Sequence, residues 1–148
     1  MSGETQTRPS TPRPYTKQLP EPTTASRPFW EAAREHRLLL QRSRKTGKYL
    51  FYPRGVSPFA TDDELEWVEA SGRGTVYSYT IARRPTAPQW GDDCPYAIAI
   101  IELEEGPHMT ANLVDCDLDA VKIGMPVVAT YSDVTPEVTL VNFRPVAS

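Results

Sequence analysis

From residue 75 onward, short runs that alternate in polarity, as in Thr75–Arg83, or are nearly all apolar, as in Pro95–Leu103, are separated by turn residues, a pattern that predicts β-strands. Between the third and fourth runs, Asp117 can cap a short helix that continues to Val121, and Gly124 can end it. Five strands with a helix at that place match the OB-fold, a five-stranded barrel. We therefore predict a mainly β protein with an OB-fold domain over residues 70–148. The five runs are Thr75–Arg83, Pro95–Leu103, His108–Val114, Pro126–Tyr131 and Val138–Arg144.

The pattern ahead of this domain predicts an arm and one helix. Residues 1–25 hold five prolines among Thr, Ser and Gln and cannot bury a core, so we expect a disordered or extended arm. Ser26 is a typical N-cap and Pro28 a typical first-turn residue, which predicts a helix over residues 26–37. One side of that helix would carry Phe29, Ala32, Ala33 and His36.

Residues 38–69 have the spacing of a zinc ribbon whose metal ligands are missing. Cysteines at positions 43, 46, 57 and 60 would form two C-x2-C pairs, the spacing with which a small hairpin builds a tetrahedral zinc site. Those positions hold Ser43, Thr46, Ser57 and Ala60, and none of these side chains can supply a thiolate. Gly47 still stands where a knuckle needs a positive φ. We therefore expect a degenerate hairpin with no metal ligands and no zinc.

The hairpin must then be held by packing, because a structural zinc ion would otherwise supply on the order of 10 kcal/mol of folding free energy. We expect apolar side chains of the hairpin to pack against the helix or the barrel, namely Leu39, Tyr49, Phe51 and Phe59. The acidic segment Asp62–Trp67 is expected to be a short link to the barrel.

Several short motifs occur together and in one order along the chain. They are Pro28-Phe29-Trp30-Glu31, Leu39-Leu40-Gln41-Arg42, Pro53-Arg54, Leu65-Glu66-Trp67, the run from Ser71 to Ser78, Pro95-Tyr96, Glu104-Glu105-Gly106, Asn112-Leu113-Val114 and the run from Ile123 to Val127. With them the chain resembles, over Leu19 to Val146, the acyl-CoA-associated family that joins a rubredoxin-like zinc ribbon to an OB-fold (domain of unknown function thirty-five). Members usually keep all four cysteines. The resemblance implies a partner of a thiolase-superfamily or hydratase-type enzyme that handles acyl-CoA.

Charge is distributed unevenly within a net charge of −3. Residues 1–54 hold 11 Lys and Arg against 4 Asp and Glu, whereas residues 55–148 hold 5 against 15. An acidic barrel is unlike a single-strand nucleic-acid binder, which needs a basic groove with interleaved aromatics. The basic portion could meet coenzyme A phosphates or an acidic partner, or could simply be a solvated surface.

The chain also lacks the apolar stretches of membrane and secreted proteins. It holds no run long enough to span a bilayer, and its polar start has no signal-peptide core, so we expect a cytoplasmic protein without membrane contact. Cys94 and Cys116 do not form a disulfide framework. Neither His36 nor His108 sits in a nucleophile or metal motif, so we assign no catalytic residue.

The stronger candidates would bind a coenzyme A thioester, the ligand that the resemblance implies. Arg83 and Arg84 could clamp a phosphate, and Trp90 could stack on the adenine or close an acyl channel. Tyr96 and Asn112 could hydrogen-bond the pantetheine amides. Phe29 and Trp30 could cover a ligand tunnel or dock on a partner. For each of these residues, the simpler reading is a surface ion pair or a packed side chain.

We therefore expect a non-catalytic, acyl-CoA-binding accessory subunit of a thiolase-superfamily enzyme, in a hetero-oligomer and with no permanently bound cofactor. The enzyme would be a thiolase or a retro-aldol lyase acting in lipid or steroid side-chain degradation. The alternative is a pure scaffold of an acyl-CoA enzyme complex, for example with a hydratase, that binds no ligand itself. A nucleic-acid binder would follow from fold analogy alone, and the acidic barrel argues against it.

Overall fold

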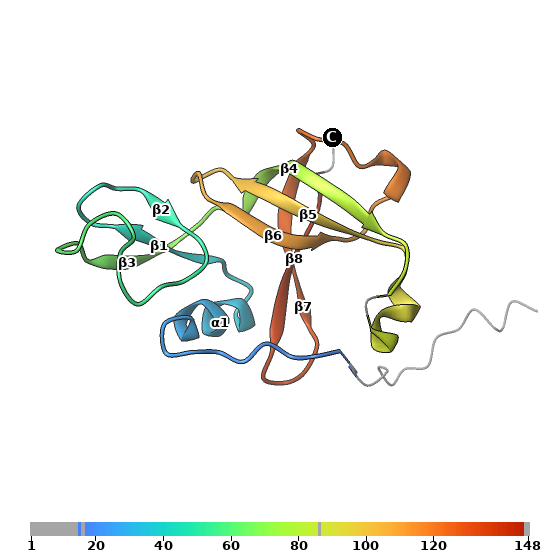
Figure 1. The fold of residues 1–148 in the computed structure, drawn as a ribbon, viewed down its shortest axis with the longest axis horizontal. Coiled ribbons are helices and arrows are strands. Elements are labelled where there is room, and N and C mark those ends of the chain that lie inside the picture. The colour runs from blue at the N-terminus through green and yellow to red at the C-terminus, as the bar shows by residue number, and fades with distance from the viewer. Residues whose placement is uncertain (1–14, 16, 86, 147–148) are drawn as a thin grey trace, which may run out of the picture.

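The computed structural model describes residue 15 and residues 17–85 and 87–146. A small three-stranded sheet with one helix lies beside a closed barrel (Figure 1). The first part contains α1 (Arg27–Arg34), β1 (Leu39–Ser43), β2 (Tyr49–Leu50) and β3 (Leu65–Glu69). The barrel contains β4 (Arg73–Ala82), η2 (Pro88–Asp93), β5 (Tyr96–Leu103), β6 (His108–Leu113), η3 (Leu118–Ala120), β7 (Pro126–Asp133) and β8 (Thr139–Pro145).

The barrel confirms the predicted OB-fold. Its strand order is β4-β5-β6-β8-β7, and antiparallel pairing of β4 with β7 brings the two ends of the sheet together. The one parallel contact joins β6 to β8 at Leu113 and Phe143. The expected helix between the third and fourth strands is a single 3-10 turn, η3, whose start is capped when the Asp119 amide donates to the Asp117 carboxylate at 3.0 Å.

Strict alternation along β5 builds the barrel core. Ala97, Ala99, Ile101 and Leu103 are all buried, because every second side chain of a strand points to the same face. From β8, Thr139, Val141 and Phe143 complete the same interior, and Phe143 is fully buried. Apolar burial at every second position is what fixes the register of these strands.

The ribbon is larger than the sequence indicated. The expected link Asp62–Trp67 is wrong in its second half, because β3 begins at Leu65 and pairs with the whole of β1. The packing prediction is right for Tyr49 and Phe51, which pack half-buried against the core. It is wrong for Phe59, which is 37% exposed, and the buried apolar residues of the ribbon are Leu38, Leu40 and Leu50.

Helix α1 packs against both the ribbon sheet and the barrel. Phe29, Ala32 and Ala33 are buried, as the helical spacing predicted, and the Phe29 ring meets the edge of Phe51 at 5.5 Å between centroids. Ser26 does not cap the helix with its side chain. Its hydroxyl instead accepts from the Thr23 amide at 2.9 Å.

Most of the predicted arm lies outside the described residues. Its described part, residue 15 and residues 17–25, runs from α1 along the barrel towards η2 (Figure 1). No helix in the described part of the chain is long and apolar enough to cross a membrane.

We predict that Gly74→Ala weakens the barrel where β4 pairs with β5 and β7. A Cβ atom at this position would lie 2.6 Å from the Glu102 carbonyl oxygen and 2.8 Å from Ile101 Cγ2, so the backbone must shift. Urea unfolding should show a loss of about 1–3 kcal/mol in the free energy of unfolding. At Gly55 a Cβ would meet nothing within 4 Å, so Gly55→Ala is the control. Equal losses in the two variants would contradict the prediction.

Candidate functional site

A hollow of about 450 Å³ lies on the barrel beside η2. One wall is Trp90, which the 3-10 turn places so that its ring stacks on Tyr96, with 5.3 Å between the ring centroids. The described arm adds Lys17, whose ammonium group lies 5.1 Å from the Trp90 ring and forms an ion pair with Asp93. The arm and the loop therefore hold each other over this hollow.

The other walls of the hollow come from three strands. Asn112 of β6, Ser132 of β7 and Asn142 of β8 supply amide and hydroxyl groups, and the Asn142 side-chain amide donates to the Ser132 hydroxyl at 3.1 Å. Cys116 also lines the hollow. Burial, and then the nearby carboxylates of Asp115 and Asp117, raise the pKa of the Cys116 thiol. A raised pKa keeps the thiol protonated at neutral pH and makes it a poor nucleophile.

A second hollow, of about 310 Å³, adjoins the first and is mostly apolar. Four aromatic side chains from α1 and the ribbon face Met109, Ala111 and Val141 of the barrel: Phe29, Trp30, Phe51 and Tyr52. The indole Nε1 of Trp30 is buried and has no hydrogen-bond partner among the described residues. Asn112, Leu140 and Asn142 line both hollows, so the two hollows lie next to each other.

The structure brings together most of the residues proposed from the sequence. Trp90, Tyr96 and Asn112 line the first hollow, and Phe29 and Trp30 line the second. Phe29 is only 2% exposed and belongs to the core, so it serves as a wall and not as a free surface side chain.

The two arginines stand apart from the rest of the proposed set. Arg83 and Arg84 are exposed, follow the end of β4 and precede the η2 loop, and they do not line either hollow.

Sequence reasoning missed several lining residues. Lys17 lies in the arm that was expected to be disordered or extended. Phe51 was expected only to pack the hairpin, and no role was proposed for Tyr52. For Asn142 the sequence holds one signal that could have identified it as a lining residue. It is a polar residue between the apolar residues Val141 and Phe143 of β8.

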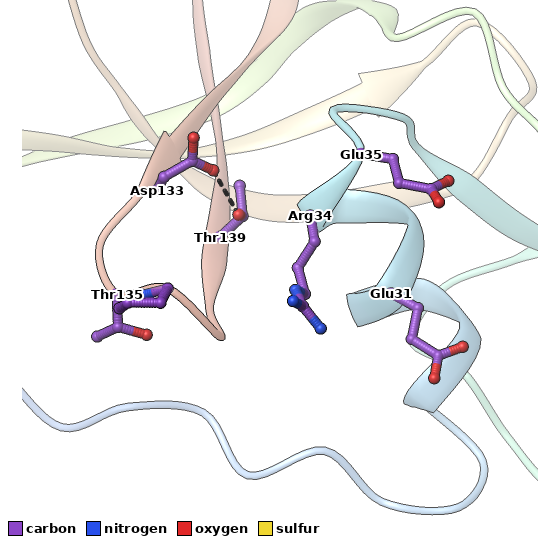
Figure 2. A pocket seen from close by; sticks show the side chains of 7 residues that line it. Glu31, Arg34, Glu35, Asp133, Thr135 and Thr139 are labelled. Carbon is purple, nitrogen blue, oxygen red and sulfur yellow. Dashed lines mark hydrogen bonds between the residues drawn. The ribbon is translucent and has the colours of Figure 1, made fainter.

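A third hollow, of about 650 Å³, is polar and lies between α1 and the turn that joins β7 to β8. Arg34 points into it, with Glu31 on the helix side and Thr135 on the hairpin side, and the Thr139 hydroxyl donates to Asp133 (Figure 2). Beside it, the His36 ring stacks on Tyr131 at 5.1 Å between centroids, and its Nε2 lies 3.1 Å from Asp133. These contacts tie the end of the helix to the barrel.

The second histidine is also paired with a carboxylate. His108 Nε2 lies 3.7 Å from Glu102, and its ring lies against Tyr77. Neither His36 nor His108 lines the two adjoining hollows. A general base must reach the proton that it removes, so these positions do not place either ring beside a ligand in those hollows.

The ribbon positions that zinc would use do not suit a zinc ion. Ser43, Thr46 and Ser57 offer hydroxyls and Ala60 offers a methyl group, whereas structural zinc takes thiolate, imidazole or carboxylate ligands. In the part of the chain that the structure describes, no three His, Cys, Asp or Glu side chains gather as a metal-ligand cluster.

Comparison with known proteins finds family models that match both the ribbon and the barrel. The model for the rubredoxin-like zinc ribbon domain of ChsH2 matches residues 30–57, and the model for the C-terminal OB-fold domain of ChsH2 matches residues 67–132. A solved structure described as an Ltp2-ChsH2(DUF35) aldolase aligns with a TM-score of 0.76 and 36% identity over 85% of this chain and 98% of that chain. A DUF35 domain-containing scaffold protein of Methanocaldococcus jannaschii is 37% identical over 105 residues, which are 69% of this chain and 73% of the relative. The chain belongs to the DUF35 family.

Other relatives of this DUF35 chain are longer proteins. The 3-oxo-4,17-pregnadiene-20-carboxyl-CoA hydratase alpha subunit of Mycobacterium tuberculosis is 38% identical over 120 residues, or 79% of this chain. The chain spans 36% of the length of that relative, and the same share of a probable enoyl-CoA hydratase alpha subunit of Thermomonospora curvata. The match to the DUF35 family confirms the resemblance that the sequence motifs indicated.

We predict that Asp133 gives this DUF35 protein a pH-dependent part of its stability. The Thr139 hydroxyl, and then the His36 ring, hold the pKa of Asp133 below its ordinary value. Because the folded pKa lies below the unfolded value of about 3.9, the stabilisation is present above that pH and is lost as pH falls through the folded pKa. Asp133→Asn should therefore lower the free energy of unfolding at about pH 7 more than at about pH 3 in urea titrations. Glu137→Gln, in the same hairpin, is the control, and a pH-independent loss in Asp133→Asn would contradict the prediction.

Proposed function

We propose that this chain is a non-catalytic, acyl-CoA-binding accessory subunit of a thiolase-superfamily enzyme. The observation that carries the proposal is the pair of adjoining hollows, one polar and one aromatic, that share Asn112, Leu140 and Asn142. Family membership supports it, because the relatives include a protein described as an Ltp2-ChsH2(DUF35) aldolase and hydratase alpha subunits.

The chemistry of the two hollows suits an amphipathic thioester. Pantetheine carries two amides, which the side-chain amides of Asn112 and Asn142 and the Ser132 hydroxyl can meet in the first hollow. The acyl group is apolar, and the aromatic walls of the second hollow would remove it from water. Trp90, stacked on Tyr96, offers a flat ring at the far side, where the adenine could lie.

For the coenzyme A phosphates, we propose two exposed arginines near the first hollow in sequence. Arg83 and Arg84 are exposed just before the η2 loop, outside the hollow that would hold pantetheine. Their place suits phosphates, which remain partly in water, better than it suits the buried amides. Lys17 lies at the same hollow but is already paired with Asp93. We therefore assign the phosphate contact to the two arginines.

The residues at these hollows favour positioning over catalysis. The Cys116 thiol has a raised pKa, and both histidines lie away from the two hollows. The partner enzyme would then supply the groups that form or break carbon–carbon bonds. This chain would hold the coenzyme A arm in place, which lowers the entropic cost of bringing the reacting atoms together.

For the partner, we favour an enzyme that cleaves a carbon–carbon bond by retro-aldol chemistry, and a thiolase is the second choice. Support comes from the solved relative described as an aldolase, which this chain covers to 98%. The Mycobacterium tuberculosis relative is named for a steroid-derived acyl-CoA, which supports a role in steroid side-chain degradation. A polycyclic acyl group would need the whole aromatic hollow.

A pure scaffold is the alternative function, and two observations favour it. Relatives from archaea are described as DUF35 domain-containing scaffold proteins. The arm closes over the first hollow through Lys17, Asp93 and Trp90, and this closure leaves less room for a ligand. In this case the aromatic walls of α1 and the ribbon would serve partner contact alone.

We predict saturable binding of octanoyl-CoA to the full chain in calorimetric titrations. Changing both Arg83 and Arg84 to Ala should weaken binding at least about tenfold, because charge-assisted bonds to phosphate are lost. That difference should shrink at high salt. Arg144→Ala is the matched control. Arg144 of β8 pairs with Val128 of β7, and Val128 also pairs with Arg73 at the start of β4. Arg144 therefore lies near the end of β4 that is opposite to Arg83. Absence of saturable binding would favour the scaffold, and equal loss in the control would contradict the phosphate assignment.

We also predict a stable complex with a thiolase-superfamily enzyme in co-purification from cells that make this chain. The melting temperature of the chain should rise when that enzyme is added, because binding to the folded state alone stabilises it. In the complex, His36→Ala and His108→Ala should leave turnover nearly unchanged. A His108→Ala complex that binds substrate normally but has lost turnover would show that this chain shares the active site. Co-purification with a hydratase and no thiolase-type enzyme would contradict the choice of partner.

A further inference from the structure

In the ribbon, one carboxylate accepts hydrogen bonds from both knuckles. Ser43 and Ser57 stand at one ligand position from each knuckle, and both hydroxyls donate to the same oxygen, Asp63 Oδ2, at 2.5 Å and 2.6 Å. We infer that the Asp63 carboxylate joins the two knuckles as a zinc ion joins them in a ribbon with four cysteines.

Two further contacts support this inference, because each serine hydroxyl also accepts from a backbone amide of its own knuckle. The Thr46 amide donates to the Ser43 hydroxyl at 2.9 Å, and the Phe59 amide donates to the Ser57 hydroxyl at 3.0 Å. The other carboxylate oxygen, Asp63 Oδ1, accepts from the Lys45 amide at 3.0 Å. One side chain therefore connects backbone groups on both corners of the ribbon.

The arrangement reverses the charges of a zinc site but keeps its connections. In a zinc ribbon the centre is a cation, and its ligands are anionic thiolates. Here the centre is an anion, and its neighbours are neutral hydroxyls that donate to it. Hydrogen bonds to an ionised carboxylate are shorter and stronger than those between neutral groups, which suits a centre that must hold two segments. The hydroxyls of Ser43, then Ser57, lower the pKa of Asp63, so the carboxylate is ionised at neutral pH.

Neighbouring charges leave Asp63 free for this role. The Lys45 ammonium group pairs with Asp62, at 2.5 Å, and only the Lys45 backbone amide reaches Asp63. The Glu64 backbone also helps to lower the pKa of Asp63. The contact is also more than a surface pair, because Ser43 is 1% exposed and lies 20 positions before Asp63 in the sequence. A buried hydroxyl that lost this acceptor would be left unsatisfied.

Hydrogen exchange on the full chain tests the inference, with Asp63→Asn as the variant and Asp62→Asn as the matched control. An Asn side chain has one carbonyl oxygen and a donating NH2 group, so it cannot accept from Ser43, Ser57 and the Lys45 amide together. The Asp62 carboxylate contacts the Lys45 ammonium group and neither serine. The amides of Lys45, Thr46 and Phe59 should exchange at least about tenfold faster in Asp63→Asn than in the control. Amides of Ala99 and Ile101 in the barrel should be unchanged. Equal exchange of the ribbon amides in the two variants would overturn the inference.

A second pair of variants tests the inference if Asp63→Asn unfolds the whole ribbon. Ser43, Thr46, Ser57 and Ala60 are all changed to Cys, alone and together with Asp63→Ala, and both proteins are purified with zinc. We expect about one zinc per chain by elemental analysis, and ribbon protection that Asp63→Ala no longer reduces. No zinc uptake, or the same loss of protection as without the cysteines, would show that Asp63 does not stand in for the metal.

Discussion

The arrangement of the ribbon and the barrel depends on the packing of one buried ring, Phe29. This ring belongs to the continuous core of the molecule, and it touches Trp30 on its own helix and Phe51 of the ribbon. It also forms a wall of the hollow against Val141 of the barrel. Because a packed aromatic side chain contributes a large apolar area, this single position joins helix, ribbon and barrel. Without it, the aromatic hollow would lose the wall that faces β6 and β8.

The barrel could be predicted from the sequence because its signal is local. Short alternating or apolar runs between turn residues mark each strand, and the five predicted strands correspond to β4–β8. The strand β3 escaped prediction for the same reason. The segment Leu65–Glu69 does not alternate in polarity, its first four residues are only half-buried, and its place is set by pairing with β1.

The candidate site could be predicted only in part, because most of it forms from segments distant in sequence. Trp90 and Asn112 could be proposed as exposed or polar residues on strands and loops, yet their meeting with Asn142 follows from the closure of the barrel. Lys17 could not be placed, because the arm has no periodic pattern to read. The role of Asp63 could not be predicted for a different reason. A carboxylate in an acidic segment looks like a solvated charge until folding brings Ser43 and Ser57 to it.

A ribbon built on hydroxyls and a carboxylate differs from a four-cysteine zinc ribbon in its response to oxidants. Thiolates oxidise to sulfenic acids and disulfides, and a zinc site loses its ligands in that process. Ser43, Ser57 and Asp63 have no such chemistry at their side chains. The ribbon of this chain can therefore keep its shape under peroxide and under metal starvation, conditions in which a four-cysteine ribbon would open.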